Sequence, residues 1–442
     1  MKTQEHFYCL ADRIQNTLET GEQFTCWFSG EKSDFIRLNH AAVRQAGSVT
    51  QGYLQVSLIS GAKQAGFVLG VSGDLERDGD YLESLFKKQR SKIEHLPEDP
   101  YLLISKTPHS SEVLKESQLP DAREIIEEVL NQAKGLDLVG IHAQGVLYRG
   151  FANSFGQRNW FTNHNFNLDF SVYHKQDKAV KAGYAGFVFD KLHLAREIEL
   201  MKEKLAVLGR PAMSLKPGAY KAYLTPSALY DLIHMLGWGA VSEKALRTKQ
   251  SALSKMRDEG RTLSSLFSIS EHTAKSTGPL FQIQGFMKPD CVSLISEGKL
   301  IGSLISPRTA KEYGLHTNGA NGSEAPEAYD VAPGALSRTA ILRELDTGIF
   351  IGNLWYLNYS DRQEARITGM TRFATFWVEN GQIKAPLNVM RFDDSLYSVL
   401  GENLLALTKE CDFILDAFTY DERSTASAHL PGALVKDFNL TL

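Results

Sequence analysis

The sequence lacks the paired cysteines that mark a zinc knuckle or a disulfide framework. Its 442 residues include only four cysteines. They are widely separated, with no Cys-x-x-Cys pair: Cys9, Cys26, Cys291 and Cys411. Isolated cysteines of this kind are typical of buried free thiols. We therefore expect four buried free thiols and no structural zinc held by cysteine.

Strong charge and long apolar runs are also missing. A formal net charge of -4 and the absence of a lysine- or arginine-rich run disfavour nucleic acid and anionic membranes as partners. No apolar run approaches the roughly 20 residues that a membrane-spanning helix needs. Residues 1–20 are polar and amphipathic rather than a signal peptide. These features predict a cytoplasmic protein that contacts neither nucleic acid nor a membrane.

Several common catalytic motifs are absent as well. No glutamate follows any of the 12 histidines, which excludes a His-Glu-x-x-His metallohydrolase helix. The nearest approach to Gly-x-Ser-x-Gly is "ANSFG" around Ser154, which lacks the first glycine and precedes a strand-like segment rather than a helix. No Walker loop and no Gly-x-Gly-x-x-Gly motif occurs. We expect Ser154 to lie in a turn or at a strand end, and nucleotide chemistry has no support.

What the chain does contain is an ordinary globular composition, with 43% hydrophobic and 23% charged residues. Helical spacing over 3–19, 121–135 and about 186–208 alternates with strand-like segments, and Asp121 can cap the start of the second of these helices. A glycine stop followed by two prolines marks the best domain boundary, near Gly209. We predict an α+β protein with an N-terminal α/β domain, 1–209, and a predominantly antiparallel β C-terminal domain, 210–442.

The C-terminal half is expected to begin with a helical pair. Thr225 and Pro226 form a helix-start signal, and a second helical stretch is predicted from about Ser242 to Asp258. Most of the remainder has the pattern of strands and turns. Asn380-Gly381 lies between two strand-like runs, which is the strongest short signal for a hairpin.

Two pairs of residues are candidates for a metal or a ligand. His164 and His174 lie at an even spacing on strand-like segments, so they could share a face, although exposed strand histidines are far commoner than metal sites. The glycine-rich stretch Gly314–Gly322, with His316 and Asn318, could let the backbone approach a ligand closely. A mobile surface loop is the more ordinary interpretation of that stretch.

The segment "NLWYLNY", Asn353–Tyr359, has large and fairly apolar residues at alternating positions on both faces. Such a strand is usually buried in a core or in a subunit interface. Trp355 and Tyr356 are therefore candidates for an interface or for lining a substrate cavity.

Several separated stretches together resemble the TldD/PmbA family, and in particular its PmbA or TldE branch. They are spread over about two thirds of the chain in the family's order: "GVLYRGFANSFGQRNW", "SPRTAKEYGLHTNGANG", "GIFIGNLWYLNYSDRQEARITGMTRFATFWVENGQIKAP" and "LPGALVKDFNLT". The resemblance implies a two-domain protein from a group of peptidases that work as two-subunit assemblies, historically linked to gyrase control. One subunit, TldD, carries zinc on a His-Glu-x-x-x-His helix with a downstream cysteine, and its partner lacks the metal site.

In "DLIHMLGWGA" the resemblance places His234 at the first zinc histidine, Met235 at the glutamate that acts as general base, and Gly239 at the second histidine. The region 422–432, near the family's cysteine, contains no cysteine. A lone imidazole does not hold zinc against water, and a thioether cannot accept the proton that a carboxylate would. We expect no catalytic residue, no metal and no cofactor in this chain, and a packed or interface histidine at position 234.

The leading hypothesis is a PmbA/TldE-like, metal-free subunit that forms a proteolytic chamber for unfolded or short peptides with a zinc-bearing TldD-like partner. An alternative is a stand-alone homodimer that binds peptides or small molecules without hydrolysing them. A third hypothesis is a hydrolase of different chemistry, built on Ser154 or on polar residues such as His316 and Asp361.

Overall fold

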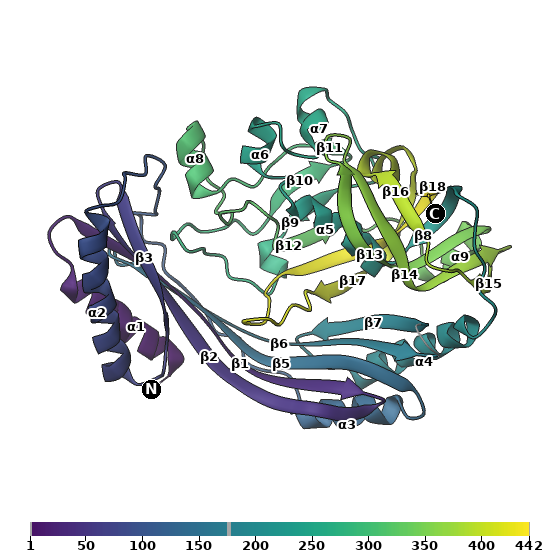
Figure 1. Ribbon diagram of the computed structural model, residues 1–442, viewed down its shortest axis with the longest axis horizontal. Coiled ribbons are helices and arrows are strands. Elements are labelled where there is room, and N and C mark those ends of the chain that lie inside the picture. Colours follow the sequence, from purple (N-terminus) through teal and green to yellow (C-terminus); the bar gives the residue numbers. More distant parts are fainter. Residues whose placement is uncertain (1, 175–177, 442) are drawn as a thin grey trace.

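The computed structural model describes residues 2–174 and 178–441 and contains two β-sheets with helices packed around them (Figure 1). The N-terminal half supplies every strand of the first sheet, and the C-terminal half supplies every strand of the second. The predicted α+β class is therefore confirmed. Within the described ranges, no helix is long and apolar enough to cross a membrane.

The first sheet has seven strands in the order β3-β2-β1-β5-β6-β4, and β7 pairs with β6 on the same edge as β4. All neighbours are antiparallel except β4 and β6. The strands are β1 Glu22–Asn39, β2 Ala42–Ser60, β3 Lys63–Gly70, β4 Ser111–Val113, β5 Asp137–Asn153, β6 Arg158–Tyr173 and β7 Ala179–Gly186. The four central strands are long, and Figure 1 shows the sheet curving beneath the C-terminal half.

Four helices accompany this sheet: α1 Thr3–Thr17, α2 Leu75–Ile93, α3 Ala122–Gln132 and α4 Lys191–Leu208. Asp74, Asp121 and Asp190 cap the last three, because each carboxylate accepts a hydrogen bond from a backbone N–H of the first turn. The capping role predicted for Asp121 is confirmed. The helix predicted from about residue 186 begins later, at Lys191, since β7 continues to Gly186 and Asp190 supplies the cap.

The second sheet has eleven strands in the order β11-β10-β9-β12-β18-β16-β14-β13-β8, with β15 beside β14 and β17 beside β18. Because β18 also pairs with β8, the strands β18, β16, β14, β13 and β8 close into a ring. The strands are β8 Gly218–Leu224, β9 Ile269–Glu271, β10 Val292–Ser296, β11 Lys299–Leu300, β12 Ala328–Val331, β13 Gly348–Asp361, β14 Arg366–Glu379, β15 Gln382–Pro386, β16 Arg391–Ser395, β17 Leu404–Leu415 and β18 Ser427–Leu440. The predicted hairpin is confirmed, since Asn380 and Gly381 both have positive φ, 53° and 68°, between β14 and β15.

The helices of the C-terminal half are short. They are α5 Pro226–His234, η1 Met235–Gly237, α6 Glu243–Arg247, α7 Ser254–Asp258, η2 Thr273–Lys275, α8 Pro307–Tyr313, η3 Arg338–Ala340, α9 Ile341–Leu345 and the π-helical turn η4 Ser398–Glu402. The single helix predicted from Ser242 to Asp258 is wrong, because α6 and α7 are separate. Lys249 adopts a positive φ of 58° between them, which interrupts the helix. The Ser251 hydroxyl then donates a hydrogen bond to the Ala240 carbonyl and fixes the segment between α6 and α7.

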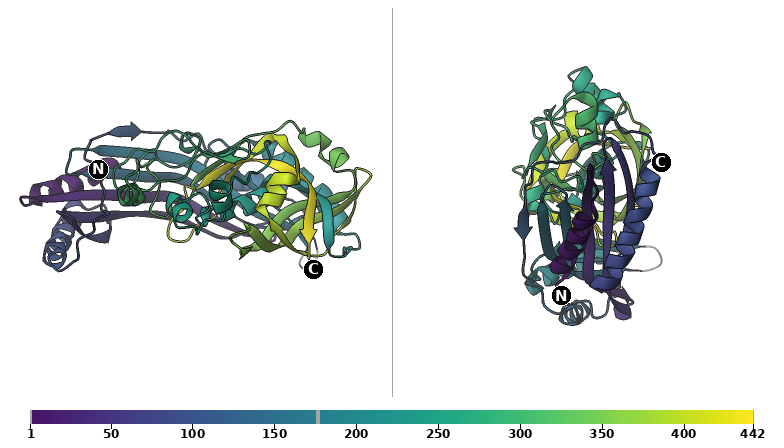
Figure 2. Two further views of the ribbon diagram at one scale, coloured as in Figure 1. Left: turned by 90° about the horizontal axis from the view of Figure 1, so that it is seen from above. Right: turned by 90° about the vertical axis from the view of Figure 1, so that its left-hand side faces the viewer.

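The two halves share apolar packing. One hydrophobic cluster contains Val180 and Met201 from the N-terminal half together with Ala374 and Phe376 from the C-terminal half. Figure 2 shows α1 and α2 at one end of the long axis and the yellow C-terminal strands toward the other. The predicted division near Gly209 falls between the last strand of the first sheet and the first strand of the second, and a division into independent domains stays a prediction.

Candidate functional site

Helix α5 carries the residues that the family resemblance places at a zinc site. Thr225 begins the helix, since its hydroxyl accepts a hydrogen bond from the Ala228 N–H at 3.2 Å and Pro226 occupies the first turn. The apolar stripe of the helix lies in the main C-terminal core: Ala228, Leu229, Leu232 and Ile233. The α-helix ends at His234, and one turn of 3-10 helix follows.

His234 and Met235 point away from each other. His234 is exposed and lies beside the Tyr230 ring, with centroids 5.6 Å apart, whereas Met235 is only 2% exposed within the core. His234 is therefore not packed in the core of this chain, because the apolar face of α5 is formed by residues on the opposite side of the helix. A place for His234 in an interface stays a prediction. Gly239 lies beyond the helix with φ of +86°. Among the residues that the structure describes, no group of three or more His, Cys, Asp or Glu side chains could hold a metal.

Asp231 is a polar residue of this helix that was not among the candidates predicted from the sequence. Its Oδ2 accepts a hydrogen bond from the Leu354 N–H at 2.9 Å, which joins α5 to β13. Burial raises the pKa of this carboxyl to about 7. A single carboxylate within an otherwise apolar helix was the available signal.

Trp355 and Tyr356 lie on the neighbouring strand β13, and both are exposed, at 51% and 76%. The interpretation of this strand as buried core is wrong at these two positions, while a role in an interface or in lining a cavity stays a prediction. The alternation breaks here because the β13–β14 register shifts after Trp355 and Tyr356 has φ of +59°. The Arg372 guanidinium covers the Trp355 ring at 4.7 Å from its centroid. The result is an exposed aromatic surface beside α5.

The glycine-rich loop Gly314–Gly322 is fixed by hydrogen bonds rather than held loosely at the surface. The Asn318 amide donates to the Ser303 carbonyl at 2.8 Å and accepts from the Ile305 N–H at 2.9 Å. Asn318 is thus committed to holding the loop, while His316 is exposed. Asp361, which was considered with His316, instead caps a turn by accepting from the N–H groups of Gln363 and Glu364.

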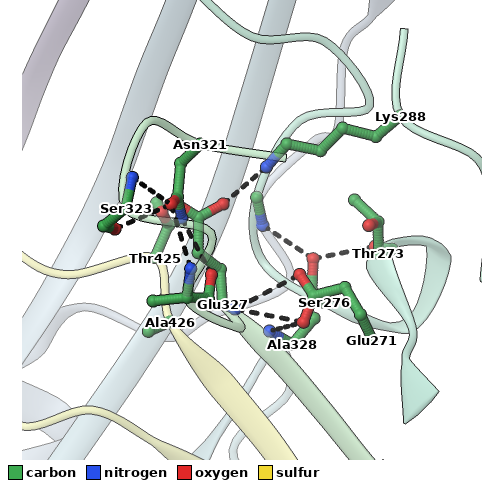
Figure 3. Close-up of polar contacts among 12 residues, drawn as sticks. Glu271, Thr273, Ser276, Lys288, Asn321, Ser323, Glu327, Ala328, Thr425 and Ala426 are labelled. Carbon is green, nitrogen blue, oxygen red and sulfur yellow. Dashed lines mark hydrogen bonds and ion pairs between the residues drawn. The ribbon is translucent and has the colours of Figure 1, made fainter. Parts of the chain in front are cut away.

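A partly buried polar cluster, with Glu271 at its buried end, lies directly beside this loop (Figure 3). The Glu271 carboxylate accepts hydrogen bonds from the backbone N–H of Ala328 at 2.9 Å and of Glu327 at 3.1 Å. The Glu327 carboxylate accepts from the Asn321 amide at 3.1 Å and from the Lys288 ammonium. The cluster therefore connects β9, β12 and the loop.

The two carboxyl groups of this cluster titrate differently. Burial raises the pKa of Glu271 to about 7, since no cation contacts it directly. Burial also acts to raise the pKa of Glu327, but the Lys288 ammonium outweighs it and holds that pKa below its usual value. Neither glutamate has a local signal in the sequence, because the partners of both are distant in the chain.

The segment near the family's cysteine position is attached to the first sheet. The Glu422 carboxylate pairs with the Arg149 guanidinium on β5 at 3.1 Å, and the buried Arg423 donates to the Asn165 carbonyl on β6 at 3.1 Å. Burial lowers the pKa of Arg423 to about 10. This segment therefore ties the two halves together through buried charges.

The remaining sequence candidates are dispersed. Ser154 lies in the turn after β5, as predicted, where its hydroxyl accepts from the Phe24 N–H at 3.3 Å. His164 lies within β6 and His174 just after it. All four cysteines are free, as predicted. Only Cys26 is buried, however, and the predicted burial is wrong for Cys291 and Cys411, which are exposed.

Fold and site define a two-sheet α+β protein whose C-terminal half closes a ring of strands against helix α5. Residues 217–442 match the family model described as the PmbA/TldA metallopeptidase C-terminal domain. The match covers just over half of the chain. The chain belongs to the PmbA/TldD family.

Solved structures share the same fold over the whole chain. A Thermotoga maritima protein whose name links it to modulation of a DNA gyrase superposes with a TM-score of 0.76 at 14% identity, covering 100% of both chains. TldE from Thermococcus kodakarensis gives 0.76 at 13% identity, with 98% of this chain and 100% of that one covered. A Bacteroides thetaiotaomicron protein, also named for modulation of DNA gyrase, gives 0.75 at 14% identity over 100% of both chains. No curated protein matches the sequence.

Proposed function

We propose that this chain is a TldE-like subunit without zinc of its own, which forms a peptide-cleaving assembly with a zinc-bearing TldD-like partner. The observation that carries the proposal is the arrangement at the end of α5. His234 is exposed, Met235 is buried, and Gly239 lies in a turn after the helix. Zinc in a peptidase requires about three protein ligands that converge on one point, and a base beside the bound water.

The proposed partner contacts the aromatic surface formed by Trp355, Tyr356 and Arg372. These residue types are enriched at protein interfaces, where large amphipathic side chains become buried on association. The surface is adjacent to α5, since Asp231 is bonded to the backbone of Leu354. A partner bound there would bring its own zinc site close to the place where this chain lacks one.

The experiment compares peptide cleavage by three samples: this chain, a TldD-like protein of the same genome, and both together. We expect cleavage of an unstructured peptide only when the zinc-bearing protein is present, with a higher rate in the mixture. Cleavage by this chain alone, lost on removal of metal with a chelator, would refute the proposal.

A stand-alone homodimer that binds peptides without hydrolysis is the second candidate. The exposed Trp355 and Tyr356 favour this homodimer as much as they favour the assembly with a TldD-like partner, because a second copy of the chain could cover them. The mass of the purified chain in solution, with and without the TldD-like protein, decides between the two. A homodimer that persists unchanged when the partner is added supports the second candidate.

A further inference from the structure

A cavity of about 610 Å³ lies between the two halves of the chain, at the N-terminal end of α5. Its walls come from β7, α4, the β8–α5 junction, α9 and strands β13–β15. A volume of this size is within the range of small-molecule sites. Its position separates it from the aromatic surface of Trp355 and Tyr356, neither of which lines it.

Two opposite charges on α4 face this cavity. Glu197 and Lys204 both line it, and among the described residues neither forms an ion pair or a side-chain hydrogen bond. They are seven residues apart, so they lie on the same face of the helix about 10 Å apart along its axis. The Lys204 ammonium lies over the Phe350 ring at 5.7 Å, and burial lowers its pKa.

The other charged side chains that line the cavity either form ion pairs or lie at its exposed rim. Arg338 pairs with Asp412, and Lys181 pairs with Asp169 at 3.0 Å. Glu203 is exposed at the rim. Glu197 and Lys204 are therefore the charges that remain available to a bound molecule.

The surface between these two charges is apolar. Leu200 and Met201 lie between them on α4, and Phe350 and Ile383 stand on the wall formed by the second half. Leu200 is 45% exposed, although it is a large apolar side chain. A ligand with an apolar body would cover it.

The cavity also offers backbone groups. Residues 180–183 of β7 line it, and β7 is hydrogen-bonded only to β6 within the described chain. The opposite edge of β7 consequently carries unpaired N–H and C=O groups that can bond an extended backbone. Ser227, in the first turn of α5, adds a hydroxyl to the lining of the cavity.

We propose that this cavity binds a free short peptide of about three residues with apolar side chains, its ammonium at Glu197 and its carboxylate at Lys204. An extended chain spans about 3.4 Å per residue, so the two ends of a tripeptide are about 10 Å apart. This distance matches the rise along α4 between Glu197 and Lys204. The site belongs to this chain alone and does not require a zinc-bearing partner.

The test is calorimetric titration of the purified full chain with Leu-Gly-Leu, its N-acetyl form, its C-terminal amide and the hexapeptide Leu-Gly-Leu-Gly-Leu-Gly. We expect Leu-Gly-Leu to bind one to one, and each blocked form and the hexapeptide to bind at least tenfold more weakly. Equal binding of the free and blocked peptides would overturn the proposal, as would no binding of Leu-Gly-Leu. These comparisons use the unaltered chain, so they do not depend on how a variant folds.

Variants locate the site. Lys204→Met and Glu197→Gln should each weaken Leu-Gly-Leu at least tenfold, and Leu200→Trp should block the cavity. Lys202→Met is the matched control on the same helix, because Lys202 pairs with Glu199 and does not line the cavity. Unchanged affinity in Lys204→Met would contradict the assignment. Failure of this test leaves cleavage with the zinc-bearing partner unaffected, so the two proposals stand or fall separately.

Discussion

His234 and Met235 are consecutive in the sequence, yet the first is exposed to solvent and the second is packed in the C-terminal core. The α-helix ends between them, and the Tyr359 hydroxyl donates a hydrogen bond to the Met235 carbonyl at 2.8 Å. A carboxylate placed at position 235 would therefore enter the core rather than join the imidazole. A zinc site is therefore disfavoured by the path of the backbone after His234 as well as by the identity of the residues.

Restoring the motif by Met235→Glu with Gly239→His should accordingly fail to create a zinc site. The buried glutamate lacks a partner, and we expect the free energy of unfolding to fall by about 3 kcal/mol. Denaturant titration measures the loss, and elemental analysis measures zinc. The control His234→Ala should change stability by less than about 0.5 kcal/mol, since the side chain is exposed. Stoichiometric zinc in the restored variant would contradict the conclusion that the side chains at positions 234 and 235 point apart.

Glu271 should make stability depend on pH. Its pKa is raised from 4.5 to about 7 in the folded chain, so between these values the folded state retains a proton that the unfolded state releases. Stability therefore falls as the pH rises from about 4.5 to 7. Glu271→Gln should flatten this decline, which thermal unfolding at a series of pH values measures.

Asp231 acts in the same pH range, because its pKa is also raised to about 7. We expect the slope that remains in Glu271→Gln to decrease further when Asp231→Asn is added. The exposed Glu379 provides the control, and Glu379→Gln should leave the slope unchanged. An identical slope in Glu271→Gln and the unaltered chain would argue against the buried position of Glu271.

Trp355→Ala and Tyr356→Ala should weaken association with the partner and leave folding intact. Loss of either ring is expected to raise Kd tenfold or more, about 1.4 kcal/mol, because aromatic side chains dominate interface energetics. Surface plasmon resonance with the immobilised TldD-like protein measures the change. Tyr81, exposed on α2, is the matched aromatic control. Equal Kd values in all three variants would show that the partner binds at another surface.

Asn318→Ala should loosen the loop Gly314–Gly322. The substitution removes both side-chain hydrogen bonds and leaves the Ile305 N–H without its partner, so we expect a loss of about 2 kcal/mol. His316→Ala, in the same loop, should have little effect. Hydrogen exchange of the loop amides distinguishes the two variants, and equal protection in both would contradict the role given to Asn318.

Local signals in the sequence predicted part of this structure. Asp121 and Asn380-Gly381 act through neighbouring backbone groups, and the cap and the hairpin follow from them. The exposure of Trp355 could not be predicted, because the bulge that reverses the pattern arises from pairing with β14. Glu271 and Glu327 meet only after β9 and β12 pair, and their contact has no local signature.

The most direct test of whether this chain is a zinc-free subunit is the zinc content of the purified chain, measured together with its mass under native conditions. The measurement is made on the chain alone and after co-expression with the TldD-like protein. We expect no stoichiometric zinc on the chain alone, and an assembly of both proteins in which all zinc belongs to the partner. One zinc per chain in the sample that contains this protein alone would contradict it.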